Sequence, residues 1–204
     1  MENFVITISR EYGSGGRIIG EKVATQLGAA FYNHNMIDMI AHESGLDRDY
    51  IEHWEQQVSS PSLWKTFMAG HKGSFTAPFH GEYYYNLGKM FFVQSKIIRE
   101  AAEKGPCVIV GRCADYILRE HHPTLHVLIH APKEDRIRRI KNDYHEHDAL
   151  KVLEAVDKGR KTYYSQNTGR TWGGYRNYDL ILNSNLGIDN CVELICTVSA
   201  KIAP

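Results

Sequence analysis

The stretch Val5-Ile-Thr-Ile-Ser-Arg-Glu-Tyr-Gly-Ser-Gly-Gly-Arg17 decides how the rest of this 204-residue chain is interpreted. It overlaps the apolar, β-rich run Phe4–Ser9, which is typical of a buried strand. After the glycines, apolar residues recur at helical spacing over Gly16–Leu27, and Gly28 is a natural helix stop. A strand, a glycine-rich turn and a helix in this order predict a phosphate-binding loop. The turn points several N–H groups at one anion, and the helix N-terminus adds its positive dipole end.

The loop departs from the standard sequence Gly-x-x-x-x-Gly-Lys-Ser/Thr in three ways. Glu11 replaces the first glycine, and Arg17 replaces the lysine. Ile18 and Ile19 stand where a hydroxyl would normally face Mg²⁺. A guanidinium still holds phosphate oxygens in a fork. The predicted phosphate-binding residues are therefore Arg10, Gly13, Ser14, Gly15, Gly16 and Arg17.

Two other interpretations of this loop were weighed on the pattern alone. A glycine turn without a ligand is the plainer one, but it leaves Arg10 and Arg17 beside three glycines without an explanation. A dinucleotide-binding loop fits less well, because it needs a third glycine where Ile18 stands. It also needs an acidic residue at the end of a second strand, and none follows near Tyr32.

Strand-like and helix-like segments alternate along the rest of the chain, which predicts a parallel, doubly wound sheet. Ligands of such sheets bind beyond the carboxyl ends of the strands. The loop after the first strand, the turn at Gly111-Arg112 and the loop after His130 should therefore meet in one cleft. The further strands are expected at Phe31–Tyr32, Cys107–Val110, Leu125–His130 and Tyr178–Asn183, and the main helices at residues 35–44, 82–104, from Pro132, 147–164 and 188–200.

Several motifs together resemble the cytidylate kinase-like family. They are Ile8–Arg17, Phe31-Tyr32, Val108–Leu118, Asp157–Tyr164 and Tyr178–Asn183. The resemblance implies a three-layer α/β fold of P-loop kinase type, with a doubly wound, parallel, five-stranded sheet. It also implies a single domain over residues 1–204, with an acceptor-side insertion at about 33–81 and a helical lid at about 136–165.

The same resemblance implies ATP as phosphoryl donor and a nucleotide such as (deoxy)cytidine monophosphate as acceptor. Mg²⁺ is expected to arrive with ATP, held mostly by water and phosphates, and no protein ligand for a metal is predicted. Phosphoryl transfer depends on positioning and positive charge. Arg17, Arg136 and Arg160 are therefore the predicted catalytic residues, the last two on the lid. Arg112 and Asn33 are the predicted acceptor contacts, although the family often has an acidic residue at the position of Asn33.

The amino-acid composition limits the classes of binding partner that are expected for this chain. Lys and Arg number 24 and so do Asp and Glu, so no general attraction to nucleic acid or to an acidic membrane is expected. No apolar run approaches the roughly 20 residues that span a bilayer. Four cysteines without a Cys-x-x-Cys pair, and a start without a signal-peptide pattern, favour the cytoplasm. The oligomeric state is not predicted.

Three functions stay open at this point. The first is an ATP-dependent kinase of a small nucleotide. The second is a nucleotide or phosphate sensor without turnover, suggested by the missing lysine and loop hydroxyl. The third is a kinase of a non-nucleotide metabolite, with a changed acceptor side at Ser59–Gly81. A zinc site at His145-Glu-His147 is the weakest of the candidate sites.

Overall fold

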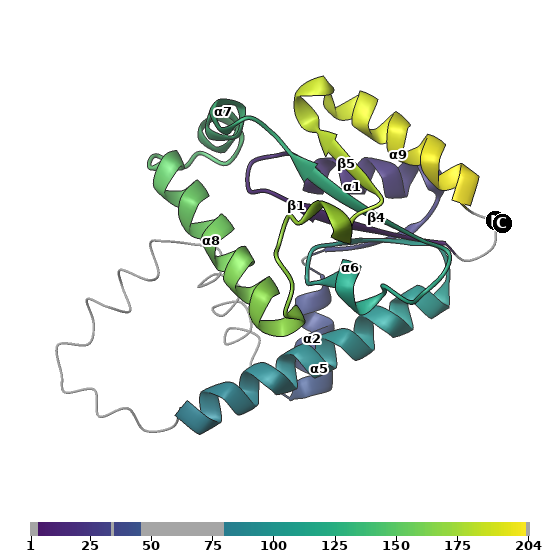
Figure 1. Ribbon diagram of the computed structural model, residues 1–204, viewed down its shortest axis with the longest axis vertical. Coiled ribbons are helices and arrows are strands. Elements are labelled where there is room, and N and C mark those ends of the chain that lie inside the picture. Colours follow the sequence, from purple (N-terminus) through teal and green to yellow (C-terminus); the bar gives the residue numbers. More distant parts are fainter. Residues whose placement is uncertain (1–3, 34, 46–79, 203–204) are drawn as a thin grey trace.

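The computed structural model describes residues 4–33, 35–45 and 80–202 of the chain (Figure 1). Its centre is a five-stranded sheet in the order β2-β3-β1-β4-β5, in which every neighbouring pair is parallel. The predicted parallel, doubly wound sheet is thereby confirmed. The strands are β1 (Val5–Arg10), β2 (Ala30–Tyr32), β3 (Cys107–Val110), β4 (Thr124–His130) and β5 (Leu180–Asn183).

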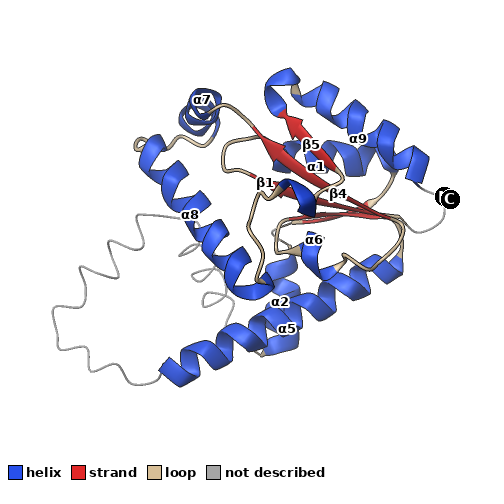
Figure 2. Ribbon diagram, in the orientation of Figure 1, coloured by secondary structure: helices blue, strands red, loops and turns tan. Residues whose placement is uncertain are grey.

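Helices cover both faces of this sheet, as Figure 2 shows. They are α1 (Gly16–Leu27), α2 (Met36–Ser44), α5 (His80–Lys104), α6 (Ala114–Ile117), α7 (Lys133–Asp143), α8 (Ala149–Thr168) and α9 (Ile188–Ile202), with short 3₁₀ turns η1 (Tyr175–Asn177) and η2 (Ser184–Leu186). Within the described ranges, no helix combines the length and the apolar character needed to cross a membrane.

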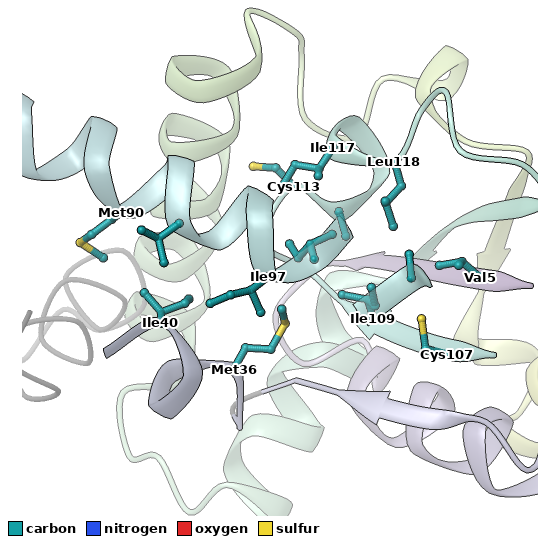
Figure 3. Packing of buried hydrophobic residues seen from close by; sticks show 14 of the residues in the cluster. Val5, Met36, Ile40, Met90, Ile97, Cys107, Ile109, Cys113, Ile117 and Leu118 are labelled. Carbon is teal, nitrogen blue, oxygen red and sulfur yellow. The ribbon is translucent and has the colours of Figure 1, made fainter. Parts of the chain in front are cut away.

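Alternate residues of β1 pack into two separate hydrophobic cores, because successive side chains of a strand point to opposite faces of the sheet. Ile6 and Ile8 are fully buried and pack with α1 and α9 on one face. Val5 packs on the other face with α2, α5 and α6. Figure 3 shows this second core, in which Met36 of α2 and Ile97 of α5 lie close together, beside Ile109 of β3. Because both faces are covered, β1 is buried from Val5 to Ser9, including the polar residues Thr7 and Ser9.

Element boundaries differ from the prediction by up to four residues, the largest difference being the end of α8 at Thr168. The last strand begins at Leu180 rather than Tyr178, because the N–H of Asp179 donates to the carbonyl of His126 before regular pairing starts. Asn35 precedes α2, but its side chain does not cap the helix. Its Oδ1 instead accepts a hydrogen bond from the N–H of Asn33 at 2.8 Å. Most of the predicted insertion at 33–81 lies outside the described residues.

Candidate functional site

The phosphate loop, residues 11–17, joins β1 to the N-terminus of α1. Gly13 and Gly15 have φ angles of +75° and +80°, which glycine adopts without strain. No side chain of the described residues caps α1. The N–H groups of its first turn, which lack intrahelical partners, therefore remain available to an anion. The hydroxyl of Ser14 is fully buried and has no hydrogen-bond partner among the described residues.

Close packing on every side fixes the shape of the loop. A Cβ atom on Gly16 would lie 2.5 Å from Cβ of Arg10, and one on Gly15 would lie 2.8 Å from Cδ1 of Ile188. A Cβ atom on Gly13 would lie 2.8 Å from the carbonyl oxygen of Arg136, on α7. These glycines are therefore required by the approach of α1, α7 and α9 as well as by the backbone angles.

Arg10 and Arg17 occupy different places around the loop. The guanidinium of Arg10 lies against Gly111, since a Cβ atom there would fall 1.8 Å from its Nη1. This contact joins the end of β1 to the turn after β3. Arg17 is exposed on the first turn of α1, and within the described part of the chain it makes no ion pair or hydrogen bond.

The turn after β3 places Arg112 in an uncommon backbone conformation. Gly111, Arg112 and Cys113 have consecutive positive φ angles of 79°, 58° and 56°. For residues with a Cβ atom such a conformation is strained and is held by its surroundings. Gln94 of α5 donates a 2.8 Å hydrogen bond to the carbonyl of Arg112, and Tyr163 of α8 donates to Gln94. Arg112 therefore sits at the predicted cleft edge, supported by two helices.

Asn33 lies at the same edge of the sheet, directly after β2. Tyr32 pairs with Ile109 of β3, so Asn33 follows at the level of Val110. Asn33 and Arg112 thus follow the carboxyl ends of the neighbouring strands β2 and β3, and their contact with an acceptor stays a prediction. The loop after β4 also joins this edge, because the N–H of Ala131 donates to Oε2 of Glu11 at 3.2 Å.

Arg136 is buried in an ionic cluster with the loop instead of extending over an open cleft. Its Nη1 lies 3.1 Å from Oε2 of Glu11, its Nη2 pairs with Asp157, and its Nε donates to the carbonyl of Tyr12 at 2.7 Å. Only 7% of the Arg136 side chain is exposed. All three guanidinium nitrogens are engaged, and its contact with a transferring phosphoryl group stays a prediction.

Arg160 reaches the loop from α8. Its Nη1 donates to the carbonyl of Arg10 at 2.9 Å, and its guanidinium lies 5.5 Å from the ring centre of Tyr12. Burial lowers the pKa of Arg160, and the nearby Asp157 carboxylate opposes this shift. An arginine keeps its charge under such conditions. The predicted lid residues Arg136 and Arg160 are therefore both brought to the phosphate loop.

Beneath the turn, Asp115 connects three parts of the fold. Its carboxylate accepts hydrogen bonds from the hydroxyls of Tyr164 at 2.6 Å and Ser9 at 3.4 Å. Burial raises the pKa of Asp115, whereas the two hydroxyl donors lower it. The side-chain donors of Asp115 thus come from α8 and β1.

Arg139 is a contact that the sequence reasoning missed. Its Nη1 donates to the carbonyl of Gly13, and its guanidinium carbon lies 3.5 Å from where a Cβ atom on Gly15 would be. It was one of several basic residues in α7, and helical charge alone did not distinguish it. Asp157 and Glu11 were also not assigned roles. Pairing of Asp157 with the loop depends on a contact between residues 145 positions apart.

Comparison with known proteins fits this arrangement. The model of the cytidylate kinase-like family matches residues 5–186. The chain belongs to the cytidylate kinase-like family. A search of curated proteins found no match. For this cytidylate kinase-like protein, the family and the fold together support phosphoryl transfer, and they leave the acceptor unconfirmed.

Solved structures share the fold of this cytidylate kinase-like chain at low sequence identity. An uncharacterized protein from Eubacterium ventriosum ATCC 27560 is 22% identical, with a TM-score of 0.71 and coverage of 97% of this chain and 98% of that one. A gluconokinase from Sinorhizobium meliloti 1021 is 14% identical, with a TM-score of 0.53 and coverage of 98% and 94%. A shikimate kinase from Acinetobacter baumannii is 13% identical, with a TM-score of 0.50 and coverage of 98% and 95%. The predicted P-loop kinase fold is thereby confirmed.

Proposed function

We propose that this protein transfers the γ-phosphoryl group of ATP to a small anionic acceptor, most simply a (deoxy)cytidine monophosphate. The observation that carries the proposal is the phosphate loop itself. A buried Ser14 hydroxyl without a partner among the described residues lies next to the uncapped start of α1. Such donors recognise phosphate oxygens through hydrogen bonds and the helix dipole.

The predicted donor and acceptor residues have separate roles in this proposal. The backbone of residues 13–17 and the Ser14 hydroxyl hold the donor phosphates, and the Arg17 side chain pairs with them from the exposed side. Arg160 stabilises charge on the transferring group. Arg10, at the end of β1, pairs with the donor phosphates, and Arg112 and Asn33, at the neighbouring strand ends, orient the acceptor.

Mg²⁺ would supply charge neutralisation of the phosphates when it is bound with ATP. Ile18, which is 37% exposed, stands where a loop hydroxyl would serve as its ligand. Among the described residues, no group of three or more His, Cys, Asp or Glu side chains is arranged to hold a metal ion. In this proposal the phosphates and water supply most of the ligands of this ion.

The direct test is ADP formation from Mg·ATP with a panel of acceptors. The panel contains the nucleoside monophosphates, and also shikimate and gluconate because structural neighbours are named for them. We expect turnover with a cytidine monophosphate. ATP binding without ADP formation from any acceptor would identify a sensor instead, and turnover with a non-nucleotide alone would refute the nucleotide acceptor.

Substitution of Arg17 tests the donor site. Arg17→Ala removes charge-assisted hydrogen bonds worth about 1.5–3 kcal/mol, so ATP should bind roughly 10- to 150-fold more weakly in calorimetry. Arg138→Ala is the matched control, because Arg138 is a 68% exposed arginine of α7 that pairs with Asp135. Equal ATP affinity of wild type and Arg17→Ala would show that the loop backbone suffices.

A further inference from the structure

The feature that the proposed function does not explain is the ionic cluster between the phosphate loop and helices α7 and α8. It consists of Glu11, Arg136, Asp157 and Arg160, two acids and two arginines. Asp157 is central: one oxygen pairs with Arg136, and the other accepts the N–H of Tyr12 at 2.8 Å and lies 4.0 Å from Arg160. Its side chain is 18% exposed.

Glu11 closes the other side of this cluster. Its Oε2 lies 3.1 Å from Arg136 and accepts the N–H of Ala131 at 3.2 Å. The residue that replaces the first glycine of the standard loop therefore has a specific partner. The formal charges of the cluster sum to zero, and Arg17 and Arg139 add positive charge beside the loop from outside the cluster.

We infer that Asp157 and Glu11 are positioning residues, which clamp Arg136 and thereby hold the phosphate loop in its anion-binding shape before ATP arrives. This inference rests on the proposed function. Both the N–H and the carbonyl of Tyr12 are held, by Asp157 and Arg136 respectively. A loop fixed at this residue presents its later N–H groups to phosphate without an ordering cost, which is how preorganisation raises affinity.

The test compares two carboxylates that connect the same helices. Asp157→Asn removes the charge in the cluster. Glu154→Gln removes an exposed ion pair between α8 and α7, in which Glu154 lies 2.9 Å from Lys133. We expect Asp157→Asn to raise the Kd and KM for Mg·ATP about tenfold or more, with the KM of the acceptor unchanged, and Glu154→Gln to match wild type. Glu11→Gln keeps an oxygen for Ala131 and serves as a second variant if Asp157→Asn does not fold.

A readout without nucleotide separates this inference from the proposed function. Amide hydrogen exchange of Tyr12 to Gly16 should be faster in Asp157→Asn than in Glu154→Gln, in the absence of ligand. If wild type does not bind ATP, the proposed function fails while exchange still tests the clamp. Unchanged exchange in Asp157→Asn would overturn the inference. Provided that wild type binds ATP, a lowered Tm of Asp157→Asn with unchanged ATP affinity would also overturn it.

Discussion

Gly16 shows how one residue links the backbone to the packing of the site. It is the first residue of α1, and the helix leaves β1 so closely that no side chain fits between them. Gly20, one turn later, faces the sheet in the same way, since a Cβ atom there would lie 2.9 Å from Cγ2 of Val110. The absence of side chains at both positions lets α1 point its N-terminus into the phosphate loop.

Gly16→Ala should therefore destabilise the protein. Overpacking against Cβ of Arg10, which cannot rotate away, costs about 1–3 kcal/mol, to be measured as a lower free energy of unfolding in urea. Without this contact the substitution would stabilise the helix by up to about 1 kcal/mol. A lower free energy of unfolding would therefore support the overpacking, and a higher one would contradict it. Gln26→Ala on the exposed side of the same helix should change stability by less than about 0.5 kcal/mol.

Among the elements, α8 has the largest part in the site. Asp157, Arg160 and Tyr164 are spaced by three and four residues, so they lie on one helical face. The first two contact the phosphate loop, and Tyr164 donates to the buried Asp115. The hydrogen bond to Asp115 thus fixes the end of the helix that lies beyond the arginine.

Tyr164→Phe should destabilise the protein more at pH 8 than at pH 5. Burial raises the pKa of Asp115. The protonated carboxyl group therefore contributes stability at low pH, and this contribution is lost as pH rises through the folded-state pKa. The Tyr164 hydroxyl opposes this loss by stabilising the ionised carboxylate, and its absence costs about 1–3 kcal/mol. Unfolding free energies at the two pH values check this expectation.

Tyr163→Phe is the control at the adjacent position. Its hydroxyl donates to the neutral amide of Gln94 at 3.1 Å, so the cost of this substitution should not depend on Asp115 ionisation. An equal pH dependence of the two variants would contradict the assigned role of Tyr164.

At the scale of the whole molecule, the strand order brings distant segments to one edge. β1 lies between β3 and β4, so the phosphate loop meets the turn after β3 and the loop after β4. Helices α7 and α8 lie beside that same edge, as Figure 1 shows. A ligand held there contacts several elements at once and should stabilise the folded state as a unit.

Mg·ATP should consequently raise the melting temperature. At a concentration 100 times its Kd, a ligand of the native state alone adds about 2.7 kcal/mol. For a domain of this size, that corresponds to a rise of roughly 5–11 °C, measurable by scanning calorimetry. Under the same conditions, Arg17→Ala should show a smaller rise at equal ATP concentration. No rise at saturating ATP in wild type would contradict a donor site.

Much of this arrangement was predictable, because local patterns carry the necessary physics. The alternation of strands and helices predicted the parallel sheet, and the glycines predicted the phosphate loop with α1 at Gly16–Leu27. The turn at Gly111-Arg112 was predicted at the ligand-binding edge because it follows a strand, and the roles of Arg112 and Asn33 toward an acceptor stay predictions. The cleft of three strand ends followed from the rule for parallel sheets. The predicted insertion and lid boundaries stay predictions.

The sequence by itself determined the loop, the sheet and the location of the site, since these depend on residues near one another in the chain and on apolar periodicity. Only the tertiary structure decided the partners of the charged residues. Arg136 pairs with Glu11 and Asp157, and Arg139 reaches Gly13, across separations of 21 to 126 residues. A charged residue on a helix can face solvent or pair with a buried group. The packing of α7 and α8 against the loop decides which of the two occurs.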